Sequence, residues 1–147
     1  MPPLFIKAIG HAGNSVPANW LSHEGWQNRL RSVVFPKYPR SVSRGSRLIY
    51  YAAGTRRFCA VLEVTSEGPG PTTEGDANRW PYQLSVRPLV AIPADDNAPT
   101  LEQVGFDPLR LRRQSHIRLT DHEYDRIADA VVAAAATNVH SGMFTPG

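Results

Sequence analysis

The three tryptophans are the residues whose type and position point most directly to chemistry. Trp20 and Trp26 lie in a segment expected to form short helical turns, and Trp80 stands between Arg79 and Pro81 at the end of a long loop. A tryptophan beside a loop can stack on a nucleobase, which contributes ~1–3 kcal/mol per base. Tryptophan is also highly buried on average, so each ring could instead close the core. Three tryptophans near loops and arginines favour base stacking, but both interpretations stay open.

Basic residues are concentrated in the first part of the chain. Residues 1–60 hold nine Lys or Arg and one acidic residue, a charge of +8, whereas residues 61–147 carry −5. A basic half suggests an anionic partner such as nucleic acid, although ordinary surface arginines would give the same count. The expected phosphate contacts are at a predicted turn, beside Trp80 and before the last strand: Arg56, Arg57, Arg79 and Arg113. Turn arginines are more often simply solvated, and Arg87 could equally pair with Glu63 on a neighbouring strand.

Several other chemistries lack their sequence signatures. The chain has no phosphate-binding Gly-x-x-x-x-Gly-Lys-Ser/Thr loop, no Gly-x-Gly-x-x-Gly and no Gly-x-Ser-x-Gly elbow. One cysteine, Cys59, cannot form a cysteine-based zinc site or an internal disulfide, and the five histidines are scattered. We therefore expect no metal, no cofactor and a non-catalytic module rather than an enzyme.

The central part of the chain predicts a hairpin followed by a third strand. Two runs rich in β-branched and aromatic residues flank a turn that contains Gly54, and the third run alternates apolar and polar residues. Before them, Leu4–Ile9 is a short apolar strand and Pro17–Arg31 holds one or two helical turns. Thr100 is the expected N-cap of a further turn. The predicted elements here are the strands Arg47–Ala52, Arg57–Thr65 and Tyr82–Val90, the turn Ala53–Arg56 and the loop Gly68–Asn78.

The end of the chain predicts one strand and one long helix. Ser115–Leu119 alternates as a closing strand, and Thr120 with Glu123 forms a capping-box pattern. A helix over Asp121–Ala136 then carries an apolar stripe that should pack on the sheet: Tyr124, Ile127, Ala128, Val131 and Val132. Strands in the middle and helices at the edges, without regular βαβ alternation, indicate an α+β fold, and a small curved barrel is plausible.

The length of 147 residues is typical of one domain. We expect this domain to span residues 1–137 and residues 138–147 to be a C-terminal tail. No secretory signal and no apolar run of about 20 residues is evident. With a single cysteine, these features predict a cytoplasmic protein in a reducing compartment.

Three short motifs carry a family resemblance. They are Gly-x-Arg-x-x-x-Tyr-x-x-Gly-Thr-Arg-Arg at 45–57, Glu-Val-Thr-Ser-Glu at 63–67 and Trp-Pro-Tyr-x-x-x-Val-Arg-Pro-Leu at 80–89. Together with the order of the elements, they resemble the EVE domain of the PUA-like superfamily, which includes YTH and ASCH domains. The match runs from about Phe5 to about Ile127. The resemblance implies a PUA-like mixed β-barrel with helices packed outside.

The resemblance also implies a pocket for a modified base, walled by aromatic rings and floored by polar groups. One polar group would come from the loop after the first strand, Gly10–Ser15, which offers Asn14 and Ser15. Both are also ordinary turn formers. Trp20 or Trp26 and Trp80 would supply the walls. On this basis the leading hypothesis is a binding module that extrudes a modified nucleobase of DNA or RNA into the pocket.

Two hypotheses of other classes remain open. The resemblance to ASCH domains implies an amidohydrolase acting on a modified nucleoside, which needs a suitably placed lysine, threonine and glutamate. Lys7, Thr65 and Glu63 are the available residues, and an ionisable Lys–Glu pair inside the pocket would distinguish this enzyme. The third hypothesis is a protein-interaction domain that uses the barrel as a scaffold, which predicts no deep polar-floored pocket. The oligomeric state is not predicted.

Overall fold

The computed structural model describes residues 2–11, 13–73, 76–111 and 116–140. The strands expected from the sequence form almost at their predicted bounds. They are β1 (Leu4–Ile9), β3 (Arg47–Ala52), β4 (Arg57–Val64), β6 (Tyr82–Ala91) and β7 (His116–Leu119). The hairpin of β3 and β4 turns at Gly54, whose φ of +100° requires glycine. A Cβ at Gly54 would also come within 2.5 Å of the Ser15 hydroxyl.

Two short strands lie in segments where the sequence analysis did not place any. β2 (Ser32–Phe35) pairs antiparallel with β6, and β5 (Gly70–Pro71) pairs with the start of β6. The segment predicted as the loop Gly68–Asn78 therefore contains a short strand near its beginning. Neither Ser-Val-Val-Phe at 32–35 nor Gly-Pro at 70–71 alternates apolar and polar residues, so neither segment shows a strand pattern. Both strands pair with Tyr82 and Gln83 at the start of β6, one on each edge of that strand.

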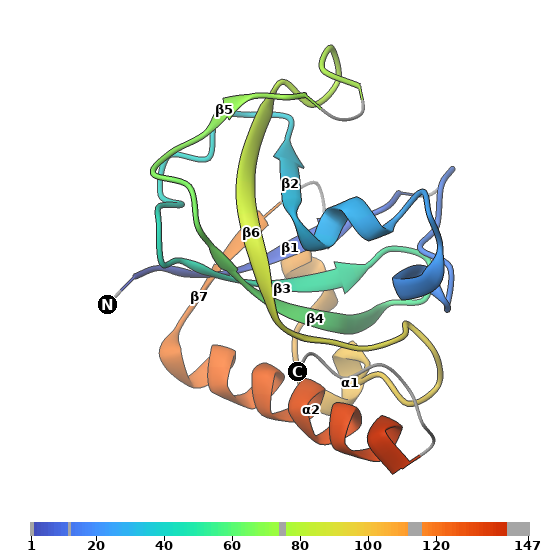
Figure 1. The fold of residues 1–147 in the computed structure, drawn as a ribbon. Coiled ribbons are helices and arrows are strands. Elements are labelled where there is room, and N and C mark those ends of the chain that lie inside the picture. The colour runs from blue at the N-terminus through green and yellow to red at the C-terminus, as the bar shows by residue number, and fades with distance from the viewer. Residues whose placement is uncertain (1, 12, 74–75, 112–115, 141–147) are drawn as a thin grey trace.

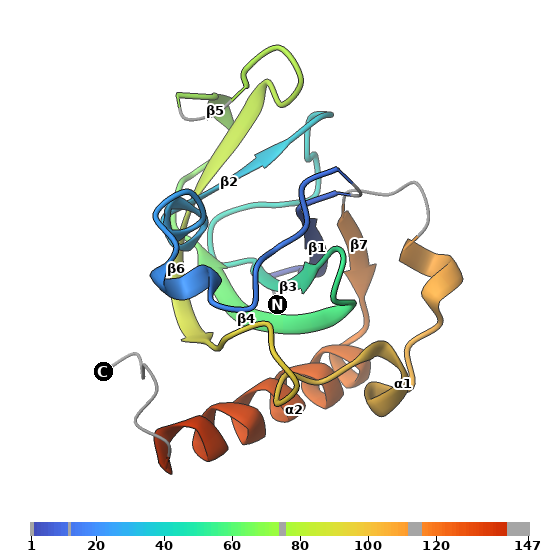
Figure 2. The same cartoon turned by 90° about the vertical axis from the view of Figure 1, so that its right-hand side faces the viewer.

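One curled sheet contains all seven strands. Six follow the order β2-β6-β4-β3-β1-β7, with β5 beside β6, and only the β1–β3 pair among those described is parallel. Register shifts lie between Tyr50 and Tyr51 of β3 and between Val61 and Leu62 of β4, and such bulges bend a sheet. Figure 2 shows the resulting open barrel.

The two edge strands of the barrel approach each other through side chains. No backbone pairing between β2 and β7 occurs in the described ranges. Instead the Phe35 ring of β2 meets the His116 ring of β7 edge-on, with centroids 5.2 Å apart. We call this opening between β1–β7 on one side and β2 on the other the seam. Since no ladder of hydrogen bonds closes it, the seam leaves room for a cavity.

Helices cover the outside of the sheet. α2 (Asp121–His140) runs beneath it, beside the short α1 (Leu101–Val104) (Figure 1), and the 3₁₀ helix η3 (Pro108–Leu111) packs against β7. The 3₁₀ helices η1 (Trp20–Ser22) and η2 (Gln27–Leu30) precede β2. Thr100 and Gln103 form a capping box at α1, as Thr120 and Glu123 do at α2. The predicted helix start and the N-cap at Thr100 are thus confirmed.

The apolar face of α2 is narrower than its sequence pattern suggested. Tyr124, Ile127 and Val131 are buried as expected, but Val132 is 54 % exposed. The prediction that Val132 belongs to the buried stripe is therefore wrong. The helix buries Ala134 in the following turn instead. The helix ends at His140, beyond both Ala136 and the expected domain boundary at 137, and residues 141–147 of the expected tail lie outside the described residues.

Candidate functional site

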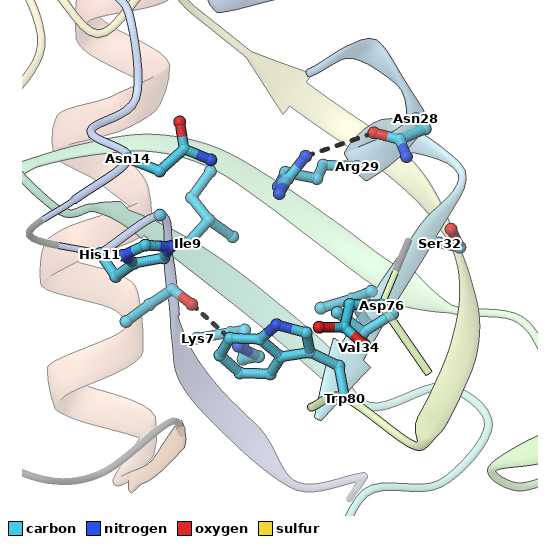
Figure 3. Close-up of a pocket in the computed structure, with 13 residues that line it drawn as sticks. Lys7, Ile9, His11, Asn14, Asn28, Arg29, Ser32, Val34, Asp76 and Trp80 are labelled. Atoms are coloured by element: carbon cyan, nitrogen blue, oxygen red, sulfur yellow. Dashed lines mark hydrogen bonds between the residues drawn. The ribbon is translucent and has the colours of Figure 1, made fainter. Parts of the chain in front are cut away.

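A cavity of about 170 Å³ opens at the seam of the barrel. Figure 3 shows side chains from several segments meeting there. They come from the end of β1 and the loop after it, from η2, from β2 and from the loop before β6. Those most important to the site are Lys7, His11, Asn14, Arg29, Asp76 and Trp80. This cavity is what we call the seam pocket.

The loop after β1 places Asn14 at the seam pocket. Gly10 has a φ of +78°, and a Cβ there would approach the Asn14 carbonyl and the Val16 side chain to 3.0 Å. His11 and Asn14 then exchange two backbone hydrogen bonds of 3.2 and 2.9 Å. The Asn14 carboxamide makes no hydrogen bond to any described residue, and it faces Arg29 across the pocket (Figure 3). Its two donors and one acceptor are thus available to a ligand.

Trp80 is half-buried at the seam pocket, on a loop whose backbone is fixed. Its N–H donates to the Asp76 carbonyl over 2.8 Å, and its carbonyl accepts from the Thr72 hydroxyl. The Arg79 guanidinium lies 5.5 Å from the ring centroid, and the Lys7 ammonium lies 5.7 Å from it. Both distances permit cation–π attraction. A partly open aromatic ring with cationic neighbours suits stacking on a base.

Lys7 is buried beside Trp80, with 4 % of its surface exposed. Its Nζ donates to the Ala8 carbonyl over 2.8 Å and lies 5.2 Å from the Phe35 ring centroid. Burial lowers the pKa of Lys7 from 10.5 to about 7, with a smaller contribution from Arg29. Burial and the nearby Lys7 also lower the pKa of His116. The pocket therefore contains a buried amine whose pKa is near neutral.

Arg29 is held at the pocket by residues of the core. Its guanidinium stacks on the Trp26 ring at 4.0 Å from the centroid, and the Trp26 ring in turn lies against Gly10. The buried Tyr50 hydroxyl donates to the Arg29 carbonyl over 2.5 Å and so fixes η2 on β3. Burial also lowers the pKa of Arg29. Trp26 thus supports a pocket arginine instead of lining the pocket itself.

The structure brings together only some of the residues expected to bind a base. Asn14 and Trp80 line the seam pocket, whereas Ser15 faces Gly54 at the β3–β4 turn. Trp20 is fully buried and its indole N–H donates to the Ile92 carbonyl over 2.8 Å. Trp26 is 5 % exposed beneath Arg29. We accordingly keep Asn14 and Trp80 in the proposed site and leave the other three out.

The expected phosphate contacts lie in different surroundings. Arg79 is exposed beside Trp80. Arg57 donates to the Ala98 carbonyl over 2.6 Å and lies 3.7 Å from Asp96. Arg56, with a φ of +60°, lies 3.9 Å from Glu102, and Arg113 is outside the described residues. Of the three that the structure describes, Arg79 alone lies beside the seam pocket.

Acidic residues of the second half neutralise part of the basic first half. Besides Arg56 and Arg57, Arg44 pairs with Glu67 at 2.6 Å. Three exposed cations lie near β2, namely Arg31, Lys37 and Arg40. None of them forms an ion pair with another described residue. We call these three residues the β2 basic cluster. Arg31 precedes β2, and Lys37 and Arg40 follow it, so the three cations flank a strand that lines the pocket. Unlike Arg56 and Arg57, they have no acidic partner among the described residues.

The lysine and glutamate of the amidohydrolase hypothesis do not meet. Lys7 lines the seam pocket, but Glu63 accepts two hydrogen bonds from Arg87 at 2.9 and 3.1 Å, as the sequence suggested, and borders another groove with Arg47. The Thr65 backbone N–H donates to the Ser85 carbonyl, and Thr65 does not line the seam pocket. The carboxylate that does line the pocket belongs to Asp76, which accepts from the N–H groups of Asn78 and Arg79. No group of three potential metal ligands occurs in the described part of the chain.

The sequence analysis did not select Arg29, His11 or Asp76, and it named Lys7 only for the enzyme hypothesis. A signal for Lys7 was present, since it is the one charged residue in the apolar strand Leu4–Ile9. Arg29 and Asp76 carry no comparable signal. They reach the pocket because β2 and the loop before β6 fold against the seam, and this contact joins segments that are far apart in sequence.

No family model and no curated protein matches this chain. Solved structures do. The YTH domain of Mmi1, solved in complex with RNA, aligns with a TM-score of 0.64 at 11 % identity, over 92 % of this chain and 81 % of that one. Protein Atu2648 from Agrobacterium tumefaciens aligns with a TM-score of 0.56 at 15 % identity (90 % and 92 %). Rpa0253 from Rhodopseudomonas palustris gives 0.55 at 13 % identity (89 % and 94 %).

These likenesses define the fold. The curled mixed sheet with helices outside, together with the match to a YTH domain, confirms the expected α+β fold, a PUA-like mixed β-barrel with helices packed outside. The relation to YTH-type proteins is likewise supported at the level of fold. Within the described residues, no helix combines the length and the apolar character needed to cross a membrane.

Proposed function

We propose that this protein is a nucleic-acid-binding module that recognises a modified nucleobase, of DNA or RNA, by taking it into the seam pocket. The observation that carries the proposal is that Trp80 and Asn14 line the same cavity at the open seam. The Trp80 ring is half-buried, and the Asn14 carboxamide has no hydrogen-bond partner among the described residues. A ring offers stacking that every base accepts, and an amide reads one base edge.

The size of the pocket agrees with a base. A cavity of ~150 Å³ in another protein accepts a benzene ring. The seam pocket, at about 170 Å³, is comparable and remains open to the exterior. An extruded base enters such a site while the strand stays outside, and unstacking requires a few kcal/mol that the pocket contacts must supply.

The phosphates beside the extruded base would be held by the β2 basic cluster and by Arg79. Lys37 and Arg40 follow β2, and the exposed Tyr38 between them meets Tyr82 edge-on with centroids 5.4 Å apart. Cations alternating with an exposed aromatic ring are typical of surfaces that bind single strands. Arg56 and Arg57 stay a weaker alternative because acidic neighbours already engage them.

Two resemblances support the proposal. The motifs at 45–57, 63–67 and 80–89 resemble the EVE domain, and the Mmi1 YTH domain of similar fold was solved with RNA. We favour binding over hydrolysis because Glu63 and Lys7 lie at different sites. We also favour base binding over a role as a protein-interaction scaffold, because that hypothesis predicts no pocket with polar lining residues.

A titration of labelled single strands tests the proposal. Otherwise identical DNA and RNA oligonucleotides, each with one central modified or unmodified base, are measured by fluorescence anisotropy. We expect one modified base to bind more tightly than its unmodified parent. Asn14→Ala should reduce that preference by roughly 2–10-fold, as expected for one hydrogen bond of 0.5–1.5 kcal/mol, and change affinity for the unmodified strand less. Equal binding of every modified and unmodified strand by the intact protein would refute the proposal.

A further inference from the structure

The seam pocket contains a cation that neither stacking nor recognition of a base by Asn14 requires. Lys7 is almost fully buried and lines the cavity, and the one hydrogen bond that it makes to a described residue uses one of three ammonium donors. The other charged or ionisable groups around the cavity come from four elements. They are Arg29 of η2, His116 of β7, His11 after β1 and Asp76 before β6.

The distribution of charge around Lys7 favours a ligand oxygen. Arg29 adds a second cation to the pocket. Asp76 is the one acidic side chain among the described lining residues, and one of its oxygens is engaged by two backbone N–H groups of its own loop. It makes no ion pair with Lys7 in the described structure. A buried cation without a carboxylate partner is unfavourable until an acceptor reaches it.

From this arrangement, and given the base-binding function proposed above, we infer that Lys7 determines specificity by binding an oxygen acceptor, such as a carboxylate, on the buried edge of a single-ring base. A methyl group placed against an ammonium would desolvate it without compensation, so a pocket that selects a methylated base would bury an apolar group at this position. The volume of about 170 Å³ favours a pyrimidine over a double-ring base.

The protonation of Lys7 makes this inference testable by pH. Burial holds the pKa of free Lys7 at about 7, and an anionic acceptor favours its charged form. Binding therefore takes up a proton, and affinity falls as pH rises above the pKa of the free protein. His116 interferes little above pH 6.5, because its own pKa is lowered from that value.

The experiment compares strands that contain one central 5-carboxycytosine, 5-methylcytosine or cytosine, by anisotropy at pH 6.5 and 8.5. We expect the carboxyl strand to bind more tightly than the methyl strand at pH 6.5, and this preference to fall about tenfold or more by pH 8.5. Lys7→Met should abolish the preference, whereas Lys7→Arg should retain it without the pH dependence. His122→Gln, which removes an exposed histidine of α2 outside the pocket lining, should leave both unchanged.

The outcomes separate this inference from the proposed function. Strands that bind through Trp80 with no carboxyl preference, or with a preference that Lys7→Met leaves intact, would overturn the role of Lys7 alone. Affinity that rises with pH would mean that a neutral amine accepts a ligand donor, which also overturns it. Failure of every strand to bind would refute the proposed function. If Lys7→Met does not fold, the pH dependence of the intact protein and of Lys7→Arg still decides.

Discussion

Trp20 and Trp80 are the same residue type and both lie outside the long strands, yet they belong to different regions of the molecule. Trp20 lies in the closed core with no exposed surface, and its indole N–H is satisfied by the Ile92 carbonyl. Trp80 is half-buried at the seam, flanked by Lys7 and Arg79, and its indole N–H has no acceptor among the described residues. The depth of the ring and the partner of its N–H separate a structural tryptophan from a candidate binding one.

The largest effect is expected for Trp20→Ala. Truncation of a core tryptophan removes ~3–5 kcal/mol of stability, and here it also leaves the Ile92 carbonyl without its donor. Thermal or urea unfolding measures this loss. Trp20→Phe is the matched control, because it keeps most of the ring volume and should recover part of the stability. A Trp20→Ala protein as stable as the parent would remove the distinction between the two regions.

The second prediction concerns how Lys7, the buried cation at the seam, makes stability depend on pH. The pKa of Lys7 is about 7 in the folded protein and 10.5 in the reference state, so the unfolded chain binds more protons between these values. The free energy of unfolding should therefore rise with pH above about 7, by up to ~1.4 kcal/mol per pH unit.

Urea titrations at several pH values between 7 and 8.5 measure this slope. Lys7→Met should lack it, so the difference between the two proteins isolates the lysine from the buried Cys59 and Tyr50, whose pKa values burial raises. Identical slopes for the two proteins would contradict the assignment of a neutral-range pKa to Lys7.

A smaller effect should follow from removal of surface charge. Replacing the β2 basic cluster, Arg31, Lys37 and Arg40, by alanine should weaken binding of every strand about equally. The slope of log K against log salt should fall by about 2, near 0.7 per phosphate contact on a single strand. Arg56→Ala with Arg57→Ala is the comparison variant, and it should change the slope less because both residues have acidic neighbours. A larger change in slope for the Arg56/Arg57 variant than for the β2 basic cluster variant would instead assign the phosphate contacts to the hairpin arginines.

The sequence was most informative where one local signal decides the structure. The N-cap at Thr100, the capping box at Thr120, the turn at Gly54 and the apolar run of β1 all predict elements that are found. Local patterns could not predict β2, because its formation depends on pairing with β6 some 50 residues later. They also could not predict which tryptophan is buried.

The lining of the candidate site could be predicted in part, and for the same reason. Asn14 and Trp80 lie in loops whose position follows from the strands on either side, and both reach the seam pocket. Arg29 and Asp76 reach it only through the contacts that η2 and the loop before β6 make in three dimensions. The charge asymmetry, finally, is a property of the sequence that ion pairs such as Arg44–Glu67 partly cancel in space.

Trp80→Ala, measured by both unfolding and binding, is the decisive variant for the seam pocket. We expect the melting temperature to change much less than in Trp20→Ala, because Trp80 is only half-buried. Binding of modified and unmodified strands should weaken by roughly 10- to 100-fold, the equivalent of ~1–3 kcal/mol of stacking. A Trp80→Ala protein that unfolds, or one that binds every strand as the parent does, would contradict the assignment of the seam pocket as the base-binding site.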